Sequence, residues 1–245
     1  MLELKNVSFT VNTDSGTLDI IDDVSFTLDS GKFLVITGPN GGGKSTLARL
    51  IMGIEKPTAG QIIFNGQDIT ALSVTEHAKL GIGYAFQHPP RFKGMTVRSL
   101  LSLAYGSDLA EDKCCEYLTN VGLCSLEYLN REVDASLSGG ELKRVEIATL
   151  MARKLGLAIF DEPEAGIDLW SFKMLVETFK KMSADKHESV IIISHQEKIM
   201  QLADEIVVVA NGKIRSFGPK DELLPQLLGE FADICDFTGK AVKSL

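Results

Sequence analysis

The period of hydrophobic and polar positions changes several times along the chain, and these changes predict short strands that alternate with helices. Residues 2–9 and 24–28 alternate between apolar and polar side chains, as strands with one buried face do. Residues 33–37 are continuously apolar, which predicts a strand buried on both faces. A glycine-rich stretch and a helical pattern over 47–52 follow directly. The chain therefore contains a strand, a glycine-rich loop and a helix in immediate succession.

The hydrophobic pattern in the middle of the chain differs from that of its two ends. Between about residues 96 and 135, leucine, tyrosine and cysteine recur at helical spacing with little strand propensity, which predicts an inserted helical subdomain. The strand–helix pattern then returns. Helices are expected at 141–155 and 169–182, and strands at 61–64, 82–86, 156–160, 190–194 and 206–210. Strands that alternate with helices imply a mostly parallel sheet with right-handed crossovers.

Composition narrows the possible partners. The 245 residues carry a net charge of −8 at pH 7, so the basic surface that a nucleic-acid-binding protein needs is absent and we expect no nucleic-acid partner. No apolar run is long enough to cross a membrane, and the first residues carry no signal-peptide pattern, so we expect a cytoplasmic protein. The cysteines form no CxxC pair and are expected to be reduced thiols rather than metal ligands; they are Cys114, Cys115, Cys124 and Cys235.

The glycine-rich loop has the spacing of a phosphate-binding P-loop. Gly38, Gly43, Lys44 and Ser45 fit the pattern GxxxxGK[ST], and the loop lies between a strand and a helix, where this motif functions. Backbone N–H groups and the helix N-terminus attract phosphate oxygens, Lys44 can reach the terminal phosphates, and Ser45 can bind Mg²⁺. A plain glycine turn with an exposed lysine is the weaker interpretation. The expected phosphate-binding residues are Gly38, Pro39, Asn40, Gly41, Gly42, Gly43, Lys44, Ser45 and Thr46.

Two carboxylates end the predicted strand 156–160, at the edge of a parallel sheet where ligands bind. Asp161 is expected to hold the Mg²⁺ bound by Ser45 through the water shell of the ion, and Glu162 to polarise the water that attacks the γ-phosphate. Solvated acids are also common at strand ends, but the P-loop makes the functional interpretation the stronger one.

A third motif, Leu137-Ser-Gly-Gly-Glu141, lies at the start of the predicted helix 141–155. With this motif the chain resembles the ATP-binding-cassette (ABC) ATPases. In that family a serine and two glycines at a helix N-terminus bind the γ-phosphate of a nucleotide held by the other subunit. The resemblance implies that Ser138, Gly139 and Gly140 contact ATP bound to a second copy, in an ATP-dependent head-to-tail dimer. Orphan N–H donors at a helix start suit this role, although a serine there can also be a simple N-cap.

Further residues match the family in chain order. Gln87 resembles the Q-loop glutamine, which senses the γ-phosphate and Mg²⁺, and His195 resembles the switch histidine, which contacts the γ-phosphate. Gly166-Ile-Asp168 resembles the D-loop at the dimer interface, where Ala165 replaces the usual serine. The aromatic residue that stacks on adenine in the family is replaced by Val11, so we expect Phe9 or a hydrophobic contact from Val11 to substitute for it. The catalytic set implied by the resemblance is Glu162, His195, Gln87 and Lys44.

The resemblance also implies the architecture. We expect an α/β fold made of a P-loop NTPase core with a mostly parallel sheet, an N-terminal antiparallel β-subdomain and an inserted α-helical subdomain. The whole chain, 1–245, is interpreted as one ATPase domain, in which 1–87 and 155–245 form the nucleotide-binding core with the β-subdomain. Residues 88–154 form the helical subdomain with the Ser-Gly-Gly motif.

The partner is harder to predict than the ATP site. The stretches Ala85-Phe-Gln-His-Pro89 and Ser138-Gly-Gly-Glu-x-Lys-Arg-x-Glu-Ile147 resemble SufC, the ATPase of iron–sulfur cluster assembly, which implies a SufB/SufD-like scaffold as partner. Asp161-Glu-Pro163 and Met95-Thr-Val97 resemble transporter ATP-binding subunits, which implies a transmembrane permease and a peripheral place at the membrane. The SufC-like interpretation is preferred at this point, and the transporter subunit is the alternative.

Overall fold

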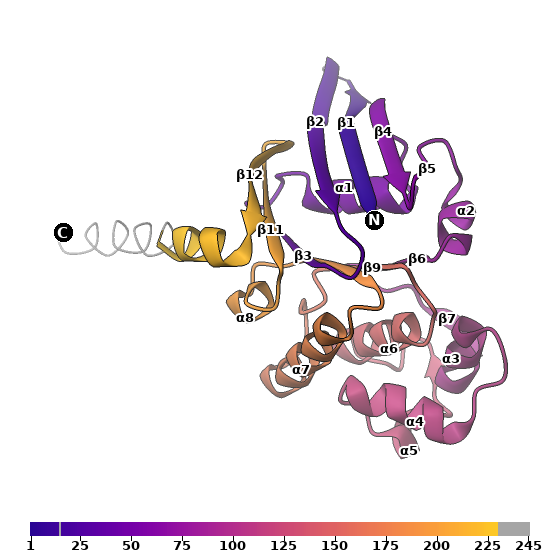
Figure 1. Cartoon of the computed structure of the whole chain (residues 1–245). Helices are drawn as coiled ribbons and strands as arrows, with labels where there is room; N and C mark the ends of the chain where they lie inside the picture. The colour runs from indigo at the N-terminus through magenta and orange to yellow at the C-terminus, as the bar shows by residue number, and fades with distance from the viewer. Residues whose placement is uncertain (15, 230–245) are drawn as a thin grey trace, which may run out of the picture.

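The central layer of the computed structural model, which describes residues 1–14 and 16–229, is a six-stranded sheet (Figure 1). Its strand order is β12-β11-β3-β10-β9-β6, and every neighbouring pair is parallel except the edge hairpin of β11 with β12. Helices cover both faces, so the inner strands are continuously apolar, as the sequence predicts. The strands are β3 (Phe33–Thr37), β6 (Ile82–Ala85), β9 (Leu157–Asp161), β10 (Ser189–Ile193), β11 (Glu205–Ala210) and β12 (Lys213–Pro219).

The N-terminal residues form a second, antiparallel sheet with strand order β2-β1-β4-β5. Helix α1 (Lys44–Met52) lies between this sheet and the central one, and it shares a hydrophobic core with both (Figure 1). Leu47 of α1 packs in that core with Val24 of β2 and Ile191 of β10. The strands are β1 (Leu2–Thr13), β2 (Gly16–Leu28), β4 (Ala59–Phe64) and β5 (Gln67–Asp68), and the short helix α2 (Val74–Lys79) follows them.

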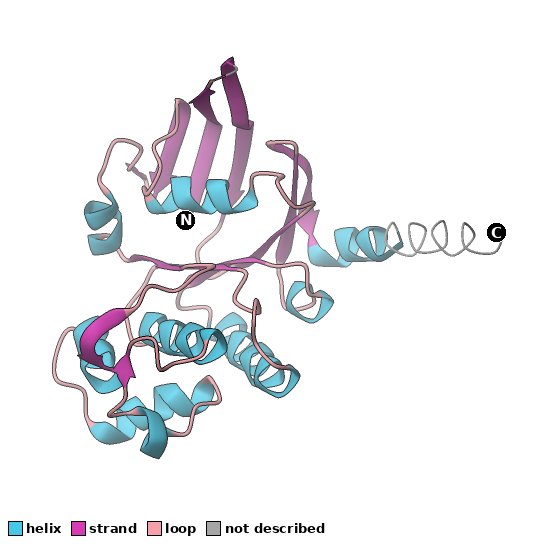
Figure 2. Cartoon of the chain, turned by 180° about the vertical axis from the view of Figure 1, so that it is seen from behind, coloured by secondary structure: helices cyan, strands magenta, loops and turns pink. Residues whose placement is uncertain are grey.

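The predicted helical insertion is present on the other side of the central sheet (Figure 2). It contains α3 (Val97–Tyr105), α4 (Glu111–Asn120), α5 (Ser125–Tyr128) and α6 (Gly139–Met151). The prediction missed one feature: β7 (Phe92–Thr96) pairs with β8 (Glu132–Val133), so the segment is not purely helical. Two such short strands leave too little alternation in the sequence to be detected.

The expected α/β fold is therefore confirmed, with helices α7 (Leu169–Asp185) and α8 (Glu197–Met200) completing it and residues 220–229 also helical. Among the residues described, no helix combines the length and the apolar character needed to cross a bilayer. Cys114, Cys115 and Cys124 are free thiols, as expected. Cys235 and the last part of the predicted core, 230–245, lie outside the described residues.

A half-buried carboxyl next to β10, that of Glu188, allows a test of the packing. Burial raises the pKa of Glu188 to about 7, and the charge of Asp185 adds to the effect. A raised folded-state pKa makes the ionised form costly, so Glu188 destabilises the fold increasingly from pH 4.5 to pH 7 and constantly above that. We expect Glu188→Gln to raise the free energy of unfolding at pH 8 by about 2 kcal/mol, and by less at pH 5.5. Urea unfolding at both pH values measures this; an equal gain at both would contradict it.

Candidate active site

The loop between β3 and α1 has the tight backbone that a phosphate cradle needs. Gly38 and Gly43 have φ angles of 130° and 104°, a conformation that side chains disfavour. A Cβ at Gly38 would lie 2.1 Å from the carbonyl oxygen of Val209, and one at Gly43 would lie 2.9 Å from that of Ile20. Only glycine lets the loop pass this close to β11 and β2, so the glycines predicted for phosphate binding also fix the path of the loop.

This loop forms the wall of a cavity of about 330 Å³, a volume typical of small-ligand sites. The cavity brings together half of the residues that the sequence singles out, although they come from distant parts of the chain. Ile20 also lines it, and the sequence analysis missed this residue. The lining residues are Ile20, Asn40, Gly41, Gly42, Gly43, Lys44, Ser45, Thr46, Gln87 and Glu162.

Lys44 is held in place by the loop that precedes it. Its Nζ donates hydrogen bonds to the carbonyl oxygens of Gly38 at 2.8 Å and Pro39 at 2.9 Å, and the side chain is buried. Burial lowers the pKa of Lys44, while the nearby charges of Glu162 and Asp161 oppose this shift. The ammonium group is therefore a buried positive charge directed at the phosphate cradle.

Removal of this charge tests the cradle. We expect Lys44→Ala to weaken ATP binding by about a hundredfold, because a charge-assisted contact to phosphate in a partly buried site contributes about 3 kcal/mol. Titration with a fluorescent ATP analogue measures the dissociation constant. Lys154→Ala, which removes an exposed lysine outside the cavity, is the control and should bind ATP normally. Equal affinity in the two variants would contradict the assignment of Lys44.

Asp161 ends β9 and has both carboxylate oxygens engaged. Oδ1 accepts a hydrogen bond from the Ser45 hydroxyl at 2.9 Å, and Oδ2 accepts one from the Tyr84 hydroxyl at 2.7 Å. A hydroxyl and a carboxylate side by side are the hard oxygen donors that Mg²⁺ prefers, so the predicted pair Ser45 and Asp161 fits this ion. No group of three or more His, Cys, Asp or Glu within 1–14 and 16–229 could hold a metal ion.

Glu162 follows directly and adopts a left-handed backbone with φ of 47°. This conformation is uncommon for a glutamate and typical of functional sites, and its N–H is anchored on the carbonyl oxygen of Ile193 at 3.1 Å. Nε2 of Gln87 donates a hydrogen bond to Oε2 of Glu162 at 2.7 Å. The structure thus brings the predicted Q-loop glutamine and the predicted catalytic carboxylate into direct contact on the cavity wall.

His195 follows β10 and lies near the charges of Lys44 and Glu162, although it is not part of the cavity lining. Burial lowers the pKa of His195, the charge of Lys44 lowers it further, and Glu162 acts in the opposite direction. The imidazole is therefore neutral at pH 7, so one ring nitrogen can accept a hydrogen bond and the other can donate one.

Several predicted residues do not line this cavity. Ser138 caps α6: its Oγ accepts from the Glu141 N–H at 3.3 Å, and its own N–H donates to Glu141 Oε2 at 2.7 Å. Asp168 caps α7, accepting from the N–H groups of Trp170 and Ser171, each at 3.0 Å. Gly139 and Gly140 lie in the first turn of α6. Both helix starts therefore have structural roles within this chain, and neither lines the cavity.

Val11, expected near the base of the nucleotide, pairs with Leu18 in the β1–β2 hairpin and is absent from the cavity lining. Ile20, two residues after Leu18 on the paired strand, takes the lining position instead. Ile20 of β2 is thus an apolar lining residue of the cavity, whereas the contact of Val11 with the nucleotide base stays a prediction.

Two side chains of α6, Lys143 and Glu146, bind the backbone of the Q-loop. This role was not predicted from the sequence for either residue. Lys143 Nζ donates to the carbonyl oxygens of Phe86, Gln87 and Asp161 at 2.6, 2.9 and 3.3 Å. Glu146 Oε1 accepts from the N–H of Phe86 at 3.0 Å. Lys143 lies between Leu142 and Val145 on the buried side of the helix, and a lysine there is the one sequence signal that could have revealed the clamp.

The comparisons with known proteins place this site in a family. The family model described as "ABC transporter" matches residues 21–165. The chain is 40% identical over 224 residues to the uncharacterized ABC transporter ATP-binding protein MJ0035 of Methanocaldococcus jannaschii, which covers 88% of this chain and 87% of that protein. The chain belongs to the ABC transporter ATPase family. The protein is thus an ATP-hydrolysing cassette, and the expected enzyme class is confirmed.

The names of other relatives include an import function. The sulfate/thiosulfate import ATP-binding protein CysA of Synechocystis is 35% identical over 218 residues, or 87% of this chain. The cassette spans 60% of the length of that protein. Among solved structures, the dimeric post-hydrolysis state of the cassette MJ0796 bound to ADP and Pi has a TM-score of 0.81 at 23% sequence identity. The match covers 90% of this chain and 99% of the MJ0796 chain, which supports the fold. These names favour the transporter alternative over the SufC-like expectation.

Proposed function

We propose that this cassette is the ATP-binding subunit of a membrane transporter and that it hydrolyses MgATP between two copies of itself. One observation carries the proposal: a single cavity gathers the P-loop, Gln87 and Glu162, with Ser45 bonded to Asp161 beside it. The relatives supply the transporter context, because MJ0035 and CysA are both named as transporter ATP-binding proteins. A permease partner would place the cassette peripherally at the membrane.

Each residue then has a chemical task. The N–H groups of the loop from Gly38 to Thr46 and the ammonium group of Lys44 bind the phosphates. Ser45, Asp161 and Gln87 would hold Mg²⁺, and when bound this ion would neutralise charge that develops on the phosphates. Glu162 polarises the attacking water, and its contact with Gln87 holds the carboxylate at the cavity wall. His195, neutral at pH 7, contacts the γ-phosphate.

The second copy supplies what the first lacks. The capped start of α6, with Ser138, Gly139 and Gly140, presents orphan N–H donors to the γ-phosphate of the partner's ATP. Asp168 and the D-loop lie along the same interface. Hydrolysis removes the bridging phosphate and loosens the dimer, so the difference in affinity for ATP and ADP drives the conformational change.

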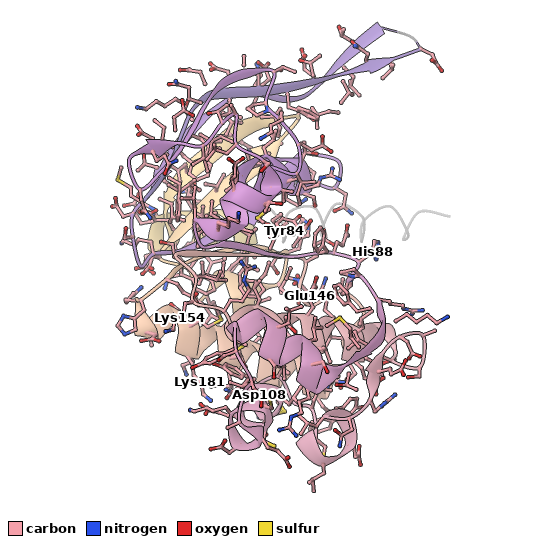
Figure 3. All side chains as sticks on the ribbon, turned by 90° about the vertical axis from the view of Figure 1, so that its right-hand side faces the viewer. Tyr84, His88, Asp108, Glu146, Lys154 and Lys181 are labelled. Carbon is pink, nitrogen blue, oxygen red and sulfur yellow. The ribbon has the colours of Figure 1, made fainter. Side chains whose placement is uncertain are left out.

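The partner is proposed to dock in an apolar groove beside the Q-loop. This groove, about 160 Å³, lies between the end of β6 and helix α6 and is lined by Tyr84, Phe86, Phe92 and Glu146 among others. In Figure 3, Tyr84 lies at the level of the central sheet and Glu146 on the helices below it. Because Lys143 and Glu146 bind the Q-loop backbone, a helix pressed into this groove would act directly on Gln87.

A SufC-like role with a SufB/SufD-like scaffold is the second candidate. The observation that favours it is the motif Glu141-x-Lys-Arg-x-Glu146, whose lysine and glutamate form the clamp on the Q-loop. In both candidates the ATP site is the same, so only the partner distinguishes them.

Purification of the tagged cassette from its native cells, with and without detergent, tests the proposal. A transporter subunit should retain a partner with membrane-spanning helices only when detergent is present during extraction. A partner without such helices that is recovered equally well in both preparations would contradict the transporter role and support the scaffold.

A further inference from the structure

The side chain of Tyr84 lies between the Asp161 carboxylate and the apolar groove beside the Q-loop. It lies on β6, next to β9, and is 7% exposed. Its hydroxyl donates the 2.7 Å hydrogen bond to Oδ2 of Asp161. Its ring lines the apolar groove and meets the ring of Phe86 edge-on, with centroids 4.9 Å apart at 66°. One side chain thus has its polar end at the catalytic centre and its apolar body in the groove.

We propose that Tyr84 is a positioning residue, whose hydroxyl fixes the orientation of the Asp161 carboxylate so that one oxygen faces Ser45. The inference rests on the metal-binding role proposed for Ser45 and Asp161. It adds a residue outside the phosphate cradle that sets the geometry of this pair.

The contacts of Asp161 show why the hydroxyl matters. The terminal torsion of an aspartate is broad, so a carboxylate held through one oxygen can rotate. Ser45 binds only Oδ1, and Lys143 binds only the backbone carbonyl of Asp161. Tyr84 supplies the second anchor on the carboxylate itself, at Oδ2. With both oxygens engaged, rotation of the buried carboxylate breaks two hydrogen bonds rather than one.

The tyrosine itself has little freedom. Phe86 and the apolar groove wall enclose its ring, so the hydroxyl is directed at Asp161 before any ligand arrives. Outer residues that orient a ligand in this way commonly change metal affinity by about ten- to a hundredfold when they are replaced.

Tyr84→Phe removes the hydroxyl and keeps the ring, so it isolates the proposed role. With the protein in excess over ADP, loss of the free Mn²⁺ signal in electron paramagnetic resonance gives the affinity of the protein–ADP complex for Mn²⁺. We expect Tyr84→Phe to weaken this affinity by about tenfold and to leave ADP binding in EDTA unchanged. Phe86→Leu, which removes the ring contact but keeps the hydroxyl, is the matched control and should retain most of the Mn²⁺ affinity.

Asp161→Asn separates the inference from the assignment beneath it. If Asp161→Asn loses Mn²⁺ binding while Tyr84→Phe retains it in full, the positioning role is overturned and the metal assignment stands. If Asp161→Asn binds Mn²⁺ normally, the metal assignment fails, and the inference with it. Tyr84→Met, a second variant without the hydroxyl, should show the same loss and replaces Tyr84→Phe if that protein does not fold.

Discussion

The variant Glu162→Gln should bind ATP and yet turn it over about a thousandfold more slowly than the unchanged cassette. Glutamine keeps the shape of the side chain, and its amide oxygen can still accept the hydrogen bond from Gln87, so the cavity wall is preserved. It carries no negative charge and cannot polarise or deprotonate the attacking water. The triphosphate therefore stays intact, and the ATP-bound dimer should accumulate.

Phosphate release gives the turnover, and size-exclusion chromatography with ATP gives the dimer. The control is Glu164→Gln, two residues further along, whose carboxylate accepts a hydrogen bond from the Ser194 hydroxyl at 2.5 Å and is absent from the cavity lining. It should keep turnover within the same order of magnitude. Undiminished turnover in Glu162→Gln would exclude that residue as the catalytic carboxylate.

The parts of the site that are local in sequence were predictable. The path of the loop is fixed by its own glycines, because Gly38 passes too close to β11, and Gly43 too close to β2, for any side chain. Asp161 and Glu162 follow a continuously apolar strand, and parallel strands place such residues at one sheet edge. Motif order then identified Gln87, which the structure places against Glu162.

Contacts between distant segments were not predictable from a single sequence. Tyr84 lies 77 residues before Asp161, and Lys143 lies 57 residues after Phe86, so nothing local marks either pair. Ile20 lines the cavity and Val11 does not, because strand pairing, rather than the pattern of one strand, decides which side chain faces the cavity. Lys143 was hidden for a related reason: its partners are backbone carbonyls, which have no sequence signature.

The choice between a transporter and a SufC-like role failed for a different physical reason. The ATP site must bind the same ligand in both classes, so its motifs carry little information about the partner. The surface that we propose to bind the partner is the groove lined by Phe86, Phe92 and Glu146, and it does not form part of the ATP site. Relatives named as transporter ATP-binding proteins therefore outweigh the resemblance to SufC in the stretches around Gln87 and Ser138.

The second large effect is expected at Gly139, the first residue of α6, where an acidic side chain should abolish the ATP-driven dimer. A Cβ built at Gly139 meets no atom within 4 Å, so Gly139→Asp fits the isolated chain. The helix dipole even stabilises a negative charge in the first helical turn. In the proposed dimer the carboxylate of each copy would face the γ-phosphate of the partner's ATP. Each such like-charge contact costs about 3 kcal/mol, so the two contacts together lower the dimer affinity by about ten-thousandfold.

The measurement combines Gly139→Asp with Glu162→Gln, so that hydrolysis does not consume the ligand, and follows dimer formation by size-exclusion chromatography with ATP. ATP binding to the monomer should be normal, because the cavity of one chain contains no part of the start of α6. Gly139→Ala adds a methyl group without charge and should still dimerise. If Gly139→Asp dimerised as readily as its parent, the Ser-Gly-Gly turn would not face a phosphate, and ATP would have to be enclosed by one chain alone.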